Sequence, residues 1–212
     1  GEDTQLLLTT AARTAGIGHG IVVGAARRQT SYMASPFTGA VLGTGNLANP
    51  GTFADPGLVV PPIDIDTGST TTRSLFVSDT MSFGDRWDVI LGLRHDTIKT
   101  ATYDRSASSP TLAAVFRPAP WLSLYGSYGE AFEQGSEAPL TAANAGQVFD
   151  PMTSEQVEIG LKAGTADWGI AAALFRLDKA LTFLGPDNVF NQDGVARYDG
   201  FGLSGKGRLD RQ

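Results

Sequence analysis

The stretch from Glu155 to Ala163 reads Glu-Gln-Val-Glu-Ile-Gly-Leu-Lys-Ala, and it decides the fold class. Every second residue from Val157 to Ala163 is apolar, and the residues between them are charged, polar or glycine. Because successive side chains of a β-strand point to opposite faces, this pattern predicts a strand with one apolar and one polar face. An amphipathic helix would repeat its apolar residues every three or four positions instead.

The same alternation recurs along the chain. Val89, Leu91 and Leu93 share one side of residues 88–96, and residues 122–129 alternate in the same way. The pattern predicts an all-β chain. We expect strands near residues 4–14, 20–31, 71–82, 87–99, 110–117, 121–133, 153–164, 168–179 and 195–209.

The predicted connections fall into two classes that alternate strictly. Short turns rich in Gly, Pro and Asp lie at 16–19, 83–86, 118–120 and 165–167. Long polar segments lie at 32–70, 100–109, 134–152 and 180–194. Outer-membrane barrels have this arrangement, with short periplasmic turns and long external loops, whereas a soluble sandwich imitates it only in part. We therefore predict a segment of an antiparallel up-and-down transmembrane β-barrel.

The three tryptophans of the chain support the same topology. Trp87, Trp121 and Trp168 each open a predicted strand directly after a short turn. Amphipathic indoles at one level are typical of the aromatic girdle at a membrane interface, although Trp also begins strands in other β proteins.

Composition removes several function classes. The net charge is −6 and the longest basic cluster is the pair Arg27 and Arg28, which argues against a nucleic-acid partner. There is no cysteine and there are two histidines, so we expect neither a thiolate nor an imidazole-rich metal site. The protease-like residues 66–70 have no second copy and fall in a predicted loop, and the glycine-rich residues 200–205 fall inside a predicted strand. We therefore expect no catalytic residue and no cofactor.

Four segments, in their order and spacing, resemble the TonB-dependent receptors of the siderophore-uptake branch. Residues 74–96 end in Gly92-Leu-Arg94-His-Asp96, like a hairpin of that family. Residues 122–132, 151–162 and 173–179 resemble further barrel strands of the family. The resemblance covers residues 71–205 more closely than residues 1–70.

The resemblance implies an outer-membrane receptor that imports ferric siderophores with energy delivered through TonB. Family barrels have about 22 strands around an N-terminal plug domain. Residues 1–212 would then be an internal part of the barrel, without the plug domain and the C-terminal strands. The implied partners are a ferric siderophore, outer-membrane lipid, the receptor's own plug domain and the TonB complex.

The resemblance also suggests roles for individual residues. The lumen-facing side chains would be Arg94, Asp96, Gln156, Glu158 and Lys162. Ligand contacts would come from aromatic and cationic residues of the external loops, namely Tyr32, Phe37 and Arg105. Two other classes stay open from the sequence: a soluble β-rich binding or adhesion module, and a complete small outer-membrane barrel that acts as a pore or an enzyme.

Overall fold

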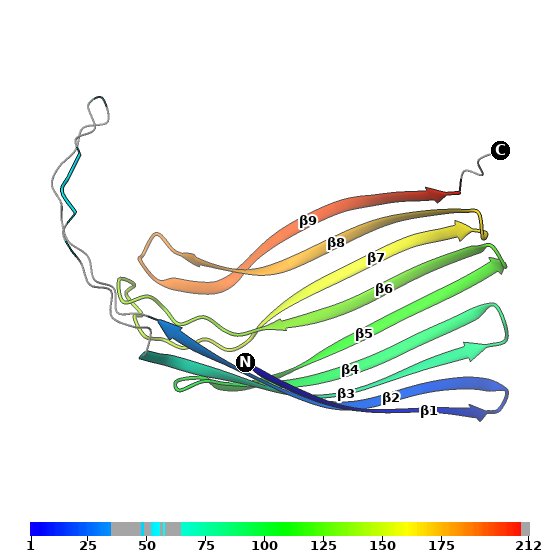
Figure 1. Cartoon of the computed structure of the whole chain (residues 1–212), viewed down its shortest axis with the longest axis horizontal. Helices are drawn as coiled ribbons and strands as arrows, with labels where there is room; N and C mark the ends of the chain where they lie inside the picture. The colour runs from blue at the N-terminus through cyan, green and yellow to red at the C-terminus, as the bar shows by residue number, and fades with distance from the viewer. Residues whose placement is uncertain (35–47, 49–51, 56, 58–64, 209–212) are drawn as a thin grey trace.

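The computed structural model describes residues 1–34, 48, 52–55, 57 and 65–208, and its strands form a single antiparallel sheet. Nine strands follow one another in chain order, each hydrogen-bonded to the next (Figure 1). They are β1 Glu2–Thr14, β2 Ile17–Ala34, β3 Ile65–Phe83, β4 Trp87–Lys99, β5 Asp104–Ala119, β6 Leu122–Glu133, β7 Met152–Gly164, β8 Trp168–Leu184 and β9 Phe190–Gly207. The predicted up-and-down all-β fold is confirmed.

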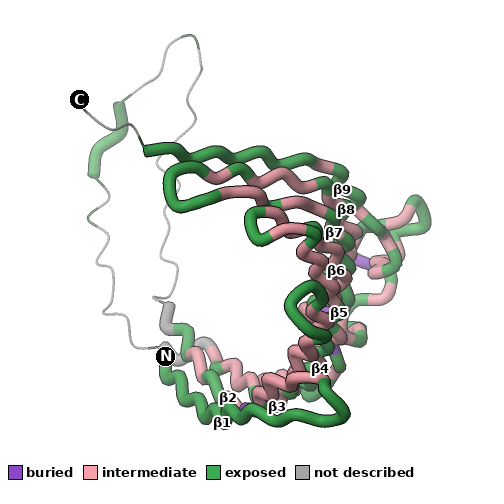
Figure 2. Tube along the Cα trace, turned by 90° about the vertical axis from the view of Figure 1, so that its right-hand side faces the viewer, coloured by how far each residue is buried: buried purple, intermediate pink, exposed green. Residues whose placement is uncertain are grey.

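The sheet is curved across its strands. Figure 2, which looks along the strands from the short-turn end, shows that the sheet bends from β1 to β9 around an open trough. Its strands are 12 to 19 residues long, whereas a tilted strand crosses a bilayer in about 9 to 11 residues. The strands are therefore longer than a bilayer crossing requires. Among the described residues, no helix is long and apolar enough to span a membrane.

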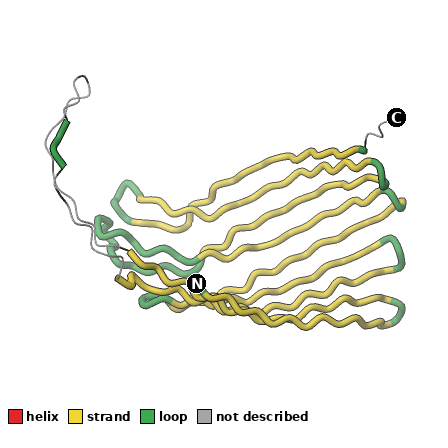
Figure 3. The backbone as a smooth tube through the Cα atoms, viewed as in Figure 1, coloured by secondary structure: helices red, strands yellow, loops and turns green. Residues whose placement is uncertain are grey.

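All the short turns lie at one end of the sheet and the longer connections lie at the other (Figure 3). The turn between β1 and β2 consists of Ala15 and Gly16, whose φ angles of 50° and 87° fit the type I′ hairpin that joins twisted strands. Three of the predicted long loops, at 32–70, 100–109 and 180–194, were too long. Residues 32–34 belong to β2, residues 65–70 to β3, residues 104–109 to β5, and residues 180–184 and 190–194 to β8 and β9. A strand whose two faces both meet water can be polar on both sides, so residues such as 104–109 need not alternate.

The strand register sorts the side chains into two faces, since directly paired residues project to the same side. Ile159 pairs with Gly126 on one side and Leu174 on the other. Such residues form an apolar face on which side chains stay uncovered: Ile159 is 57% exposed and Phe201 is 79% exposed. The opposite, polar face holds every buried polar residue among those described, namely Ser74, Asp96, Ser109 and Ser154.

Candidate functional site

The first cluster on the polar face joins Arg94 and Asp96 of β4 to Ser74 of β3. Arg94 Nε donates to both carboxylate oxygens of Asp96, at 2.9 and 2.8 Å, and its Nη2 donates to Ser74 Oγ at 2.7 Å. Ser74 Oγ also donates to Asp96 Oδ1 at 2.5 Å. The guanidinium lies over the Phe76 ring, 5.7 Å from its centroid. Arg94 thus has charge and aromatic partners, while 49% of its side chain remains exposed.

A second cluster lies on the same face around Tyr125 of β6. The Tyr125 hydroxyl donates to Glu158 Oε1 at 2.7 Å, and Gln156 Nε2 donates to Glu158 Oε2 at 3.4 Å. Lys162 Nζ lies 5.4 Å from the centroid of the Tyr125 ring. The register places Arg94, Asp96, Gln156, Glu158 and Lys162 on one face, as the alternation predicts. That this face lines a lumen stays a prediction.

A third cluster, which the sequence reading did not single out, lies near the short turns. Asp88 accepts a hydrogen bond from Ser82 Oγ at 2.8 Å and one from Arg117 Nη2 at 2.5 Å. These residues come from β3, β4 and β5, so only the strand register brings them together. The polar face therefore carries paired charges from the short turns up to Asp96.

Three aromatic rings on the polar face each lie across a glycine of the neighbouring strand. Phe76 is paired with Gly24, Tyr125 with Gly160, and Phe175 with Gly200. A Cβ atom on Gly160 would stand 2.6 Å from the Tyr125 ring, and one on Gly24 would stand 2.3 Å from Phe76. A side chain on these three glycines would collide with the rings, so only glycine lets each ring lie flat against the neighbouring strand of the sheet.

At the long-loop end, residues 134–151 pack onto the ends of β5 and β9. The backbone N–H of Gly135 donates to the hydroxyl of Tyr103, which is 3% exposed. Asn144 Nδ2 donates to the carbonyl of Phe190, and Asn144 Oδ1 accepts from the Phe190 N–H. The Phe149 and Phe190 rings meet edge to face with centroids 5.7 Å apart. We call residues 134–151, with the parts of β5 and β9 that they contact, the loop platform.

The predicted ligand-binding residues are placed differently from the expectation. Tyr32 lies in β2, beside a register shift in its pairing with β3, and Arg105 lies in β5; neither is in a loop. Both strands extend further toward the long-loop end than the sequence pattern shows. Arg105 Nε bonds Asp150 Oδ1 at 3.1 Å and so helps to hold the loop platform. Phe37 lies outside the described residues.

The tryptophans lie at the short-turn end, as expected. Trp87 and Trp168 are the first residues of β4 and β8, and Trp121 lies in the turn directly before β6. Trp87 stacks on Phe116 with ring centroids 4.4 Å apart. All three are partly exposed, by 46%, 51% and 39% in chain order. Their role in a membrane girdle stays a prediction.

The motifs set aside as non-catalytic lie in strands. Residues 66–70 are in β3 and not in the predicted loop, and residues 200–205 are in β9. His95 and Asp96 project to opposite faces, and His95 Nδ1 lies 3.0 Å from Ser108 Oγ on the apolar side. Among the described residues, no group of three or more His, Asp or Glu side chains is arranged to hold a metal ion.

Comparison with known proteins gives a consistent result. Residues 2–210 match the family model described as TonB dependent receptor-like, beta-barrel. Ferrichrome receptor FcuA of Yersinia enterocolitica is 29% identical over 180 residues, which is 75% of this chain and 24% of that protein. Probable TonB-dependent receptor BfrD of Bordetella pertussis is 31% identical over 130 residues, which is 50% of this chain and 18% of that protein.

A solved structure also resembles the chain. The ferric preacinetobactin receptor BauA from Acinetobacter baumannii superposes with a TM-score of 0.77 and 25% identity, over 97% of this chain and 33% of BauA. The chain thus spans between 18% and 33% of these three proteins.

Proposed function

This chain belongs to the TonB-dependent receptor-like β-barrel family, and from that premise we propose that it forms part of the wall of a receptor that imports ferric siderophores. It is an outer-membrane protein. The rest of the barrel, which in such receptors has about 22 strands, and the plug domain would come from other parts of the parent protein. TonB would act through that plug domain, and this chain would supply no catalytic residue.

The observation that carries the proposal is the division of the sheet into an apolar face and a charged face. Arg94 with Asp96 and Lys162 with Glu158 lie on the polar face, where a water-filled lumen and a plug surface keep charges hydrated or paired. The apolar face leaves Val157, Ile159 and Leu174 more than half exposed, which suits contact with lipid and not with water.

Two observations argue against the alternatives. A soluble adhesion module would have to keep a continuous apolar face in water, and such patches cause association. A complete small barrel would need β1 to pair with β9, whereas the described strands form an open sheet with these two at its edges.

The ligand class comes from the relatives. FcuA is named as a ferrichrome receptor and BauA as a ferric preacinetobactin receptor. We propose that this chain's receptor also takes an iron chelate, and that external loops, the loop platform among them, contact it. External loops can change their shape without breaking the hydrogen-bonded wall, which makes them suited to recognition.

Iron uptake by the full-length parent receptor tests this function. The receptor is expressed in an iron-starved host that lacks its own siderophore receptors, and uptake of radioactive iron is measured from ferrichrome and from a ferric catecholate. We expect saturable uptake of at least one chelate, and we expect it to disappear when the host's TonB is deleted. A receptor that is inserted in the outer membrane but takes up neither chelate would contradict the proposal.

A loop deletion separates recognition from scaffolding. Replacing residues 36–64 by a short Gly-Ser linker should weaken chelate binding while the barrel still inserts. The matched control is Leu174→Val, which changes an exposed residue of the apolar face and should leave binding unchanged. An unchanged affinity for the chelate would indicate that the plug domain or the loop platform, and not residues 36–64, recognises it.

A further inference from the structure

Two arginines lie side by side on the apolar face, close to its long-loop end. Arg27 of β2 and Arg73 of β3 are direct cross-strand partners, and both are exposed. Like charges at directly opposed positions destabilise a sheet. Arg27 Nη2 donates to Gln29 Oε1 at 2.6 Å. No carboxylate of the described residues forms an ion pair with Arg27 or Arg73.

Arg176 and Arg197 also lie on the apolar face, but both form ion pairs. Arg176 Nε bonds Asp199 Oδ1 at 2.7 Å, and Arg197 bonds both carboxylate oxygens of Asp178, at 2.7 and 2.6 Å. Each of those arginines has its own acidic partner on the adjacent strand. The pair at Arg27 and Arg73 therefore has two positive charges that nothing in the described part of the sheet neutralises.

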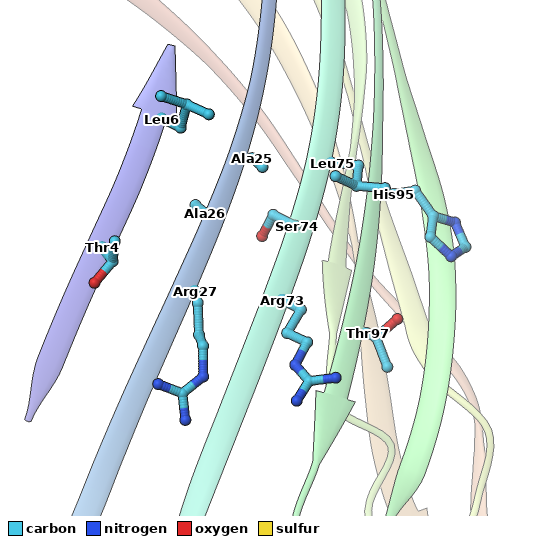
Figure 4. Close-up of a pocket in the computed structure, with 10 residues that line it drawn as sticks. All are labelled: Thr4, Leu6, Ala25, Ala26, Arg27, Arg73, Ser74, Leu75, His95 and Thr97. Atoms are coloured by element: carbon cyan, nitrogen blue, oxygen red, sulfur yellow. The ribbon is translucent and has the colours of Figure 1, made fainter.

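The arginine pair stands at the edge of an apolar hollow of about 480 Å³. Leu6, Ala25 and Leu75 line the hollow from three neighbouring strands. Figure 4 shows both guanidinium groups extending away from these three residues, toward the other end of the hollow. His95 also lines it from β4, and Thr4 and Thr97 flank the arginines in the same cross-strand row. The hollow thus joins an apolar surface to a positively charged rim.

The height of the pair fits the boundary of the outer leaflet. Phe83 pairs with Trp87 at the short-turn end of β3, and Arg73 lies ten residues further along the strand. At a rise of about 3.3 Å per residue and a tilt of about 40°, ten residues cover about 25 Å. This matches the height of the apolar band of outer-membrane barrels, about 25 Å. Both arginines therefore lie where lipid headgroups meet acyl chains.

We propose that Arg27 and Arg73 bind the phosphate of a multiply acylated lipid of the outer leaflet, with an acyl chain lying over Leu6, Ala25 and Leu75. Guanidinium groups bind phosphate through paired hydrogen bonds, and a phosphate between the two arginines would supply the missing negative charge. The inference rests on the outer-membrane placement of the sheet but not on the chelate that the receptor imports.

Native mass spectrometry of the full-length receptor, purified in mild detergent, tests the site. The probes are bis-phosphorylated lipid A and the same lipid after enzymatic removal of its phosphates. We expect the wild-type receptor to bind the phosphorylated lipid more tightly. The double variant Arg27→Gln/Arg73→Gln should lose about tenfold in affinity for the phosphorylated form, as expected when a charge-assisted contact is lost, and should no longer distinguish the two lipids.

Two controls isolate the arginine pair. Arg28→Gln changes the next residue of β2, which projects to the polar face and bonds Asp3, and it should leave lipid binding unchanged. Arg27→Lys/Arg73→Lys keeps the charge without the paired donors and should bind with intermediate affinity. Equal binding of the two lipids by the wild-type receptor would overturn the proposal, even if the double variant did not fold. Retained discrimination in a folded double variant would overturn it as well.

Discussion

His19 Nδ1 and Asp79 Oδ2 lie 2.7 Å apart on the apolar face, between β2 and β3. Their side chains are 18% and 27% exposed, and within the described structure the second carboxylate oxygen, Oδ1, is buried and has no hydrogen-bond partner. Asp79 is four residues from Phe83 along β3. A polar pair therefore stands in the part of the apolar band nearer the short turns, where each partner lowers the cost of placing the other beside lipid.

Removing one partner of this pair should destabilise the intact receptor. His19→Ala leaves Asp79 alone on the apolar face, and we expect a loss of about 2 kcal/mol in the free energy of unfolding. The double variant His19→Leu/Asp79→Val removes both polar groups and should recover most of that loss. Urea unfolding in lipid vesicles measures both. A double variant less stable than His19→Ala would show that the pair itself stabilises the sheet.

The face assignment predicts unequal effects for two residues of β7. Ile159→Arg places a charge on the apolar face near the middle of the membrane and should cost about 2 to 4 kcal/mol in folding free energy. Gln156→Arg places the same charge on the polar face and should cost much less. Both variants are compared in the full-length receptor by the same unfolding assay. Equal costs would contradict the face assignment, and a higher cost for Gln156→Arg would mean that the two faces are reversed.

The glycine beneath Tyr125 should be sensitive to a single methyl group. In Gly160→Ala the new Cβ would lie 2.6 Å from the Tyr125 ring and 2.7 Å from the carbonyl oxygen of Ala172. The ring, with its hydrogen bond to Glu158, and the backbone would both have to shift, which should cost about 1 to 3 kcal/mol through overpacking. Gly126→Ala is the matched control, because its Cβ would meet Ile159 at an ordinary 3.8 Å. The difference between the two variants in the free energy of unfolding is the measurement. Equal free energies of unfolding for the two variants would show that the Tyr125 ring can move aside without destabilising the sheet.

The loop platform depends on the hydroxyl of Tyr103. Tyr103→Phe leaves the buried N–H of Gly135 without its acceptor and should cost about 1 to 3 kcal/mol locally. We expect faster cleavage by protease within residues 134–151 while the barrel remains intact. Tyr198→Phe, at a residue that is 54% exposed, is the control and should leave the cleavage rate unchanged. Equal cleavage rates in the two variants would show that the Tyr103 hydroxyl does not order residues 134–151.

All nine strands were predictable because an amphipathic strand in a membrane wall has a simple two-residue period, as in residues 155–163. The strand ends toward the long loops were less predictable. Residues 104–109 and 191–194 are almost all polar or glycine, so the period disappears although the hydrogen-bonded ladder continues. Arg105 was placed in a loop for this reason, whereas Tyr32 was placed in one because residues 32–70 contain five prolines and many small residues.

The candidate site was predictable only where its residues are close in sequence. Arg94 and Asp96 share a face because they are two residues apart on one strand. The partnership of Asp88 with Arg117, the fit of Phe76 over Gly24 and the juxtaposition of Arg27 with Arg73 all depend on strand register. Register follows from which residues pair across the turns and long loops, and alternation within one strand does not contain that information.

The rings of Phe76, Tyr125 and Phe175 each lie across a glycine, and in a receptor whose lumen is lined by the polar face this would set how much clearance a permeating solute has. A ring standing upright from the wall would narrow the passage by its full length, whereas a ring lying across its neighbour narrows it by little more than its thickness. Rings that lie flat on the sheet would therefore leave a wider lumen for a bulky molecule. A larger residue at Gly24, Gly160 or Gly200 would thus act as an obstruction, and its effect on transport would grow with the size of the solute.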